Sequence, residues 1–227
     1  VVSGVELVEE EQLPLPHGVE QRAVAPLEQR AVALPETRGV RGGGERGYGI
    51  SCAEDPTLLI TQHPLPTAPT KPLSLVTTAA RIAVDDPLAR VKSANKLGSV
   101  LAKGEAAAHG VDDGLILNSD GNITETSSAN IFWVEDGALR TPPISDGVLP
   151  GITRRLVIEL APALGRTVRE ESIAPGRLQQ GKAVFVTSAA TGVVAVGKVD
   201  GIALGTHPLV GQLLDAREAE LEKHTAN

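Results

Sequence analysis

The spacing of apolar and polar residues changes along the chain, and this change predicts where the regular structure lies. Within the first 40 residues the apolar positions keep no steady period, and we expect one or two short helices that break at Pro26. The apolar run Leu58-Leu59-Ile60 and the following Thr61 predict a short buried strand. The N-terminal part therefore offers little regular structure before that strand.

A proline-rich stretch follows the strand. Four prolines occur at positions 64, 66, 69 and 72, a density that excludes the interior of a helix or a sheet. An extended linker fits this composition better. We therefore predict a small N-terminal domain over residues 1–66 and a larger C-terminal domain over residues 67–227.

The predicted C-terminal domain alternates between strand and helix patterns. Residues 73–79 predict a strand, and residues 93–109 predict a helix whose face would carry Ala94, Leu97, Leu101 and Ala108 and which Gly110 would end. Ser119-Asp120-Gly121 and Glu135-Asp136-Gly137 each lie between two short apolar runs, as hairpin turns do. Further helices are predicted over 152–165 and 207–223, and further strands over 183–187 and 193–196. Hairpins interspersed with helices indicate a mixed α/β or α+β domain rather than a wound parallel sheet.

Composition excludes several classes of function. The net charge of −7 disfavours a nucleic-acid partner, whose binding surface would be basic. No apolar run approaches the roughly 18 residues of a membrane span, and no signal peptide is recognisable. With Cys52 as the only cysteine, the chain cannot form an internal disulfide, so we expect a cytoplasmic protein. The five histidines show no spacing typical of a metal site.

Three features in the C-terminal part suggest a common chemistry. Lys92 precedes a predicted helix, Glu125 lies in a predicted strand, and Pro150-Gly151-Ile152-Thr153 opens another helix. Pyridoxal phosphate needs a lysine amine for covalent attachment and an acid beside its ring nitrogen. It also needs a site for its phosphate, which the free N–H groups of a helix N-terminus can provide. The three features could together bind this cofactor.

The motifs around these residues resemble the class IV pyridoxal phosphate enzymes. This family includes aminodeoxychorismate lyase and the branched-chain and D-amino-acid aminotransferases, and the resemblance covers roughly residues 41–205. It is strongest over residues 92–101, 120–134 and 141–154. The resemblance implies the two-domain, D-amino-acid-aminotransferase-like fold of fold type IV, with a shorter N-terminal domain than the family's, and a homodimer. It also implies a cofactor site formed by Lys92, Glu125, Ser128, Ile152, Thr153 and Ser188.

Two segments bear on the reaction. Residues 41–49, Arg-Gly-Gly-Gly-Glu-Arg-Gly-Tyr-Gly, resemble a lyase segment, in which Arg41 and Arg46 would bind a substrate carboxylate. Residues 192–196 depart from the aminotransferase pattern, whereas residues 149–154 agree with it. The first-ranked function is therefore an aminodeoxychorismate lyase, which releases pyruvate from 4-amino-4-deoxychorismate to give 4-aminobenzoate for folate synthesis. The alternative is an aminotransferase acting on branched-chain or D-amino acids with 2-oxoglutarate.

The sequence suggests two other interpretations of the chain. The glycines at positions 42, 44 and 47 match the spacing of a dinucleotide-binding fingerprint. The sequence indicates no hydrophobic strand before them and no helix after them, so it disfavours a dinucleotide site. A non-catalytic module that keeps the fold for binding or dimerisation is the third hypothesis, because we find no counterpart of the family's N-terminal arginine for the cofactor phosphate.

Overall fold

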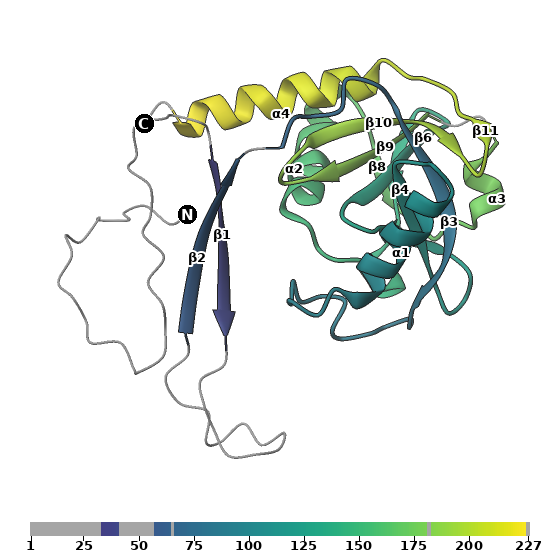
Figure 1. Ribbon diagram of the computed structural model, residues 1–227. Helices are drawn as coiled ribbons and strands as arrows, with labels where there is room; N and C mark the ends of the chain where they lie inside the picture. The colour runs from purple at the N-terminus through teal and green to yellow at the C-terminus, as the bar shows by residue number, and fades with distance from the viewer. Residues whose placement is uncertain (1–32, 41–56, 65, 181–182, 226–227) are drawn as a thin grey trace, which may run out of the picture. The chain divides into compact units, whose positions relative to one another are not determined.

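The structure is a computed structural model that describes residues 33–40, 57–64, 66–180 and 183–225 (Figure 1). The predicted helices around Pro26 lie outside these residues. So do Arg41, Arg46, the glycine-rich segment around them and Cys52.

Two strands form a small antiparallel sheet in the N-terminal part. β1 (Ala33–Val40) pairs with β2 (Thr57–Pro64) in a register that joins Ala33 to Pro64 and Val40 to Thr57. The strand predicted around Leu58 is thus confirmed and extends to Pro64. The expectation that no strand precedes the glycine-rich segment is wrong, because the backbone groups of residues 33–40 pair with a strand distant in sequence, which no local pattern reveals. The domain boundary after residue 66 stays a prediction.

A nine-stranded sheet organises the rest of the described chain. Its strands are β3 (Leu73–Ile82), β4 (Asp113–Asn118), β5 (Ile123–Thr126), β6 (Asn130–Glu135), β7 (Ala138–Thr141), β8 (Val168–Glu170), β9 (Ala183–Ser188), β10 (Gly192–Val199) and β11 (Ile202–Ala203). The order is β11-β10-β3-β4-β5-β6-β7-β8, and β9 pairs with both β10 and β6. β9 therefore closes β10, β3, β4, β5 and β6 into a ring. Antiparallel and parallel pairs both occur, which confirms the mixed fold.

The longer helices each pack against different strands of this sheet. α1 (Leu97–Ala108) packs against β3 and β4, whereas α2 (Ile152–Leu160) contacts β9 and α4 (Leu209–Thr225) contacts β10. A short helix, α3 (Pro175–Leu178), precedes β9, and two 3₁₀ turns span Ile144–Asp146 and Ala161–Leu164. The predicted single helix over residues 152–165 is thus divided, because Pro162 cannot continue the α-helical hydrogen bonds.

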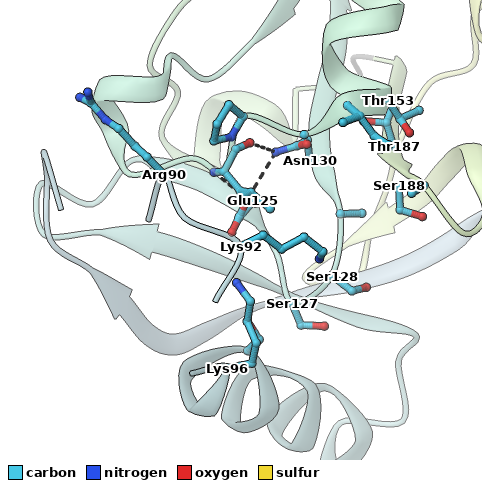
Figure 2. Close-up of a pocket in the computed structure, with 17 residues that line it drawn as sticks. Arg90, Lys92, Lys96, Glu125, Ser127, Ser128, Asn130, Thr153, Thr187 and Ser188 are labelled. Carbon is cyan, nitrogen blue, oxygen red and sulfur yellow. Dashed lines mark hydrogen bonds between the residues drawn. The ribbon is translucent and has the colours of Figure 1, made fainter. Parts of the chain in front are cut away.

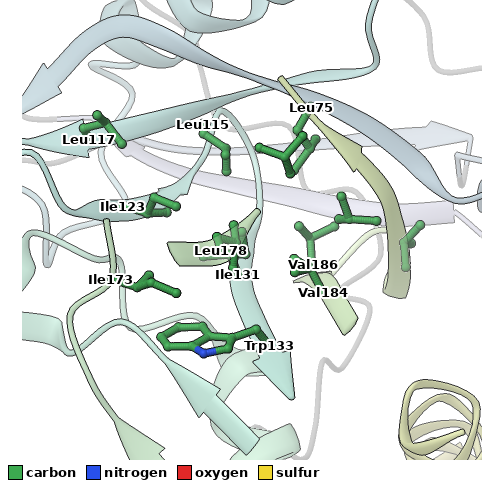
Figure 3. Close-up of a cluster of buried hydrophobic side chains, with 13 residues drawn as sticks. Leu75, Leu115, Leu117, Ile123, Ile131, Trp133, Ile173, Leu178, Val184 and Val186 are labelled. Carbon is green, nitrogen blue, oxygen red and sulfur yellow. The ribbon is translucent and has the colours of Figure 1, made fainter. Parts of the chain in front are cut away.

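Side chains of β6 enter two separate hydrophobic clusters. Ile131 and Trp133 belong to the cluster shown in Figure 3, together with Ile123 of β5. Phe132 belongs to the second cluster and stacks on Phe185 with ring centroids 5.1 Å apart. This division follows from the alternation of side chains between the two faces of a strand.

Both predicted hairpins are confirmed. Gly121 in the first turn has a φ of 83°, and in the second turn Asp136 and Gly137 have φ values of 52° and 74°. Glycine and aspartate accept this left-handed conformation more readily than most residues, which is why their position in the sequence marked the turns.

The predicted buried face of α1 is wrong. Leu97 and Leu101 are 65% and 61% exposed, whereas Ala102 and Ala106 are fully buried. At Gly114 of β4 the strand runs so close to the helix that a Cβ there would come within 2.6 Å of the Ala102 carbonyl oxygen. Only small side chains fit this contact, so alanines rather than leucines face the sheet.

Candidate active site

A cavity of about 290 Å³ brings the sequence-predicted residues together (Figure 2). Its lining includes the predicted cofactor residues Lys92, Glu125, Ser128, Ile152, Thr153 and Ser188. The sequence did not single out six further polar residues of the lining, which are Arg90, Lys96, Ser99, Ser127, Asn130 and Thr187. Arg41 and Arg46 lie outside the described residues, so their role as substrate ligands stays a prediction.

The local fold of β5 directs Glu125 into this cavity. Ile116 of β4 pairs with Glu125, whereas the next residue, Leu117, pairs with Ile123, so β5 has one extra residue between the two pairs. Such a bulge bends a strand and changes the direction of its side chains. Ile123 can therefore join the hydrophobic cluster while Glu125, two residues later, lines the cavity.

The Glu125 carboxylate is held by two donors. Its Oε2 accepts a hydrogen bond from the Leu149 N–H at 3.1 Å and another from Asn130 Nδ2 at 3.3 Å. Asn130 Nδ2 also donates to the Leu149 carbonyl at 2.8 Å, so one amide fixes both the carboxylate and the loop before α2. Burial raises the pKa of Glu125 to about 7, and the Leu149 hydrogen bond and the charges of Lys96 and Lys92 oppose this rise.

The N-terminus of α2 lies on the same cavity. Gly151 is the N-cap residue and offers no side chain to the first N–H groups of the helix, which leaves them available for an anion. Gly151 also packs against Asn130, since a methyl group at this position would overlap with Asn130 Oδ1. Thr153 is buried, whereas Ile152 is 68% exposed.

Two neighbouring hydroxyl groups at the end of β9 differ in their partners. The Ser188 hydroxyl bonds with the Thr191 hydroxyl at 2.8 Å and accepts a hydrogen bond from the Thr191 N–H at 3.1 Å. The Thr187 hydroxyl is buried and has no hydrogen-bond partner among the described residues, although Thr187 also lines the cavity. A buried polar atom without a partner is costly, so Thr187 is better suited than Ser188 to contact a bound group.

The buried carboxylate of Asp113 holds the loop between β5 and β6, whose Ser127 and Ser128 line the cavity. Asp113 accepts hydrogen bonds from the hydroxyl groups of Ser127 and Ser128, and Ser127 N donates to the Gly114 carbonyl at 3.0 Å. The loop between β5 and β6 is thereby tied to β4. In Figure 2 the Lys92 side chain extends towards Ser128 of this loop.

A comparison of sequences identifies the family. Residues 38–199 match the amino-transferase class IV family, which is 162 of the 227 residues. The chain belongs to this family. The family expected from the motifs is thus confirmed. Class IV aminotransferases use pyridoxal phosphate, which confirms the expected cofactor.

Individual class IV proteins are similar to the chain over part of their length. A protein of Methanocaldococcus jannaschii named as a branched-chain-amino-acid aminotransferase is 36% identical over 168 residues, which are 71% of this chain and 57% of that protein. A crystal structure from Legionella pneumophila, named as a 4-amino-4-deoxychorismate lyase, superposes with a TM-score of 0.72 at 30% identity and covers 78% of this chain and 66% of its own.

A second class IV structure comes from Escherichia coli. It is a branched-chain amino acid aminotransferase, and it superposes with a TM-score of 0.69 at 31% identity, covering 76% of this chain and 60% of its own. The fold type IV expectation is thus confirmed. The chain spans about three fifths of the length of these relatives.

The described residues suit the cofactor of the class IV family. The cavity offers a buried carboxyl group, a buried hydroxyl group without a partner and an uncapped helix N-terminus, in addition to lysine amines. Within the described part of the chain, no cluster of histidine, cysteine, aspartate and glutamate side chains could hold a metal ion. The same part contains no helix that is long and apolar enough to cross a membrane.

Proposed function

We propose that this chain is a pyridoxal phosphate-dependent enzyme that acts on a small amine substrate, with Lys92 as the residue that binds the cofactor covalently. The observation that carries the proposal is that Lys92, Glu125 and the N-terminus of α2 line one cavity, although they lie 33 and 26 residues apart in sequence. When bound, pyridoxal phosphate supplies a ring that accepts electrons from the substrate.

Each group of the cavity has a distinct task under this proposal. The Glu125 carboxylate would keep a proton at the ring nitrogen. The N–H groups of Ile152 and Thr153, with the hydroxyl groups of Thr153 and Thr187, would bind the phosphate. Lys92 Nζ, once displaced by the substrate amine, would move the proton at the substrate carbon.

Amino-group transfer is the first candidate reaction, ahead of the lyase reaction that the sequence ranked first. The support is the Methanocaldococcus jannaschii relative, which is named as a branched-chain-amino-acid aminotransferase and matches 168 residues. The second candidate is the aminodeoxychorismate lyase reaction. It is supported by the Legionella pneumophila structure of that name, at a TM-score of 0.72, and by the lyase-like segment at residues 41–49.

Two substrates separate these reactions. The purified protein would be incubated with pyridoxal phosphate and then, in separate samples, with aminodeoxychorismate or with a branched-chain or D-amino acid and 2-oxoglutarate. Glutamate formation supports the transferase, and pyruvate release without amino-group transfer supports the lyase. Lys92→Ala should abolish either activity, whereas unchanged turnover in this variant contradicts the proposal.

The absorbance spectrum tests the third hypothesis, the non-catalytic module. A class IV enzyme with the proposed Lys92 should develop a visible band of lysine-bound cofactor when pyridoxal phosphate is added, and Lys92→Ala should lack it. A wild-type protein that never develops this band would leave only the binding or dimerisation role.

A further inference from the structure

A second lysine, Lys96, enters the cavity immediately before α1, and the cofactor chemistry described above assigns it no task. We propose that Lys96 is a positioning residue whose ammonium group stabilises the ionised form of the Glu125 carboxyl group, so that Lys92 is left for the cofactor. The part of this proposal that concerns Lys92 rests on the proposed function.

The geometry separates the two lysines. In Figure 2 the amine of Lys96 points towards Glu125, whereas that of Lys92 points towards Ser128. Lys96 and Glu125 also line an adjoining cavity of about 220 Å³, and Lys92 does not. Lys96 and Glu125 thus belong to the wall that the two cavities share.

The electrostatic effects agree with this arrangement. Both lysines lower the pKa of Glu125, and the effect of Lys96 is the larger of the two. Neither amine forms a direct ion pair with the carboxylate in the described structure, so the charges act through space. Once Lys92 is bonded to the cofactor its amine is committed there, and Lys96 remains as a cation directed at Glu125.

The other charged groups that line the two cavities already have partners. Arg81 Nη1 donates to the carbonyl groups of Thr78 and Ala80, at 2.6 and 2.9 Å. Arg90 lies 3.9 Å from the carboxylate of Asp85.

Among the described residues, the adjoining cavity is lined by one acidic residue besides Glu125, which is Asp86. Asp86 Oδ1 accepts a hydrogen bond from the Leu88 N–H at 2.8 Å. The amine of Lys96, by contrast, makes no hydrogen bond or ion pair with another residue in the described part of the chain, so its charge is available to Glu125.

The ionisation of Glu125 can be measured directly in the 227-residue chain. Infrared spectra recorded from pH 5 to pH 9 contain the carbonyl band of neutral carboxyl groups, and Glu125→Gln identifies the contribution of this residue. In the wild-type protein without cofactor the band should disappear with a midpoint near pH 7. Lys96→Gln and Lys96→Met should raise this midpoint by about one pH unit, because an attractive charge is removed.

Three further variants make the test specific. Lys96→Arg retains the charge and should restore a midpoint close to that of the wild type, while Lys198→Gln removes an exposed lysine that lines neither cavity and should change nothing. Lys92→Gln should raise the midpoint less than Lys96→Gln. Equal midpoints in Lys96→Gln and Lys198→Gln, or a larger effect of Lys92→Gln, would overturn the role of Lys96.

A second readout keeps this proposal separate from the proposed function. The protein with bound cofactor is reduced with borohydride, digested and analysed by mass spectrometry. A pyridoxyl group on Lys92, in the wild type and in Lys96→Met, agrees with both proposals. A label on Lys96 refutes the division between the lysines, whereas a label on neither refutes the proposed function and leaves the infrared test of Lys96 intact. Thermal unfolding establishes that each variant is folded.

Discussion

At the scale of single residues, opposing forces act on the Glu125 side chain. Burial favours its neutral form, whereas the Leu149 N–H and two lysines favour the carboxylate. A group with a pKa of about 7 changes charge within the physiological range. Its ionisation therefore depends on the positively charged side chains that line the cavity.

The stability of the cofactor-free protein should depend on pH through this residue. The pKa in the folded protein, about 7, lies above the ordinary value of 4.5, so the stabilising contribution is full below pH 4.5 and is lost as the pH rises through 7. The loss amounts to up to about 3 kcal/mol. Glu125→Gln should thus be more stable than the wild type at pH 8 and equally stable near pH 4.5, as measured by urea unfolding. A wild type that gains stability relative to this variant above pH 7 would contradict the assignment.

Thr187 should contribute to cofactor affinity rather than to stability. Thr187→Val removes a buried hydroxyl group that has no partner among the described residues, so the thermal midpoint should stay or rise. Affinity for pyridoxal phosphate should fall about tenfold, because a hydrogen bond to a charged group is lost. Ser188→Ala is the matched control, since its hydroxyl group is bonded to Thr191, and it should reduce affinity less. A fluorescence titration with cofactor measures both variants.

The residues of the cavity differ in how far the sequence could reveal them. Lys92, Glu125 and Thr153 belong to ordered local motifs, so their contribution to one site could be predicted. Lys96, Asn130 and Thr187 carry no such local signal, because their importance comes from contacts between segments that are distant in sequence. Asn130, for example, joins Glu125 to Leu149.

At the scale of elements, the start of α2 combines two requirements. The helix needs free N–H groups directed at the cavity, and the preceding loop must pass closely over Asn130 of β6. Glycine at position 151 meets both needs, because any Cβ there would overlap with Asn130 Oδ1.

Gly151→Ala should therefore impair both the fold and the cofactor site. The overlap should cost about 1–3 kcal/mol of unfolding free energy and disturb the hydrogen bonds of Asn130 to Glu125 and Leu149. Gly104→Ala is the control, since Gly104 lies in α1 with no atom near the position of the new methyl group. It should stabilise the protein by about 0.5–1 kcal/mol. A Gly151→Ala protein that binds cofactor normally and unfolds like the wild type would contradict this account.

The sequence predicted some elements better than others for physical reasons. The two hairpins could be located because their turns need left-handed residues, and Gly121, Asp136 and Gly137 provide them. The face of α1 could not, since its orientation depends on the close approach of Gly114 and not on the spacing of its leucines. The pairing of β1 with β2 likewise depends on a partner that follows the glycine-rich segment.

At the scale of the whole molecule, several apolar side chains remain uncovered. They are Leu88, Val91, Leu97, Val100, Leu101 and Ile152, all at least 55% exposed. Ile152 lines the proposed cofactor cavity, and three of the others lie on α1. We expect a second copy of the chain to cover this surface, in line with the homodimer that the family resemblance implies.

Charged substitutions test this association. Leu97→Glu and Leu101→Glu together should shift the protein from dimer to monomer in analytical ultracentrifugation, because burying two carboxylates in an apolar interface is unfavourable. Lys198→Glu, a change at an exposed position outside this group of side chains, should leave the dimer intact. A wild-type protein that sediments as a monomer at high concentration would refute the expected homodimer. The cytoplasmic location, inferred from the single cysteine, stays a prediction.

The proposed function depends above all on Lys92 binding pyridoxal phosphate in the cavity that also contains Glu125 and the N-terminus of α2. Borohydride reduction of the protein with bound cofactor, followed by peptide mapping, identifies the lysine that carries the cofactor. One pyridoxyl group per chain is expected on Lys92, and none on this peptide in Lys92→Ala. A label confined to another lysine, or a wild-type chain that acquires no label, would contradict the proposed function.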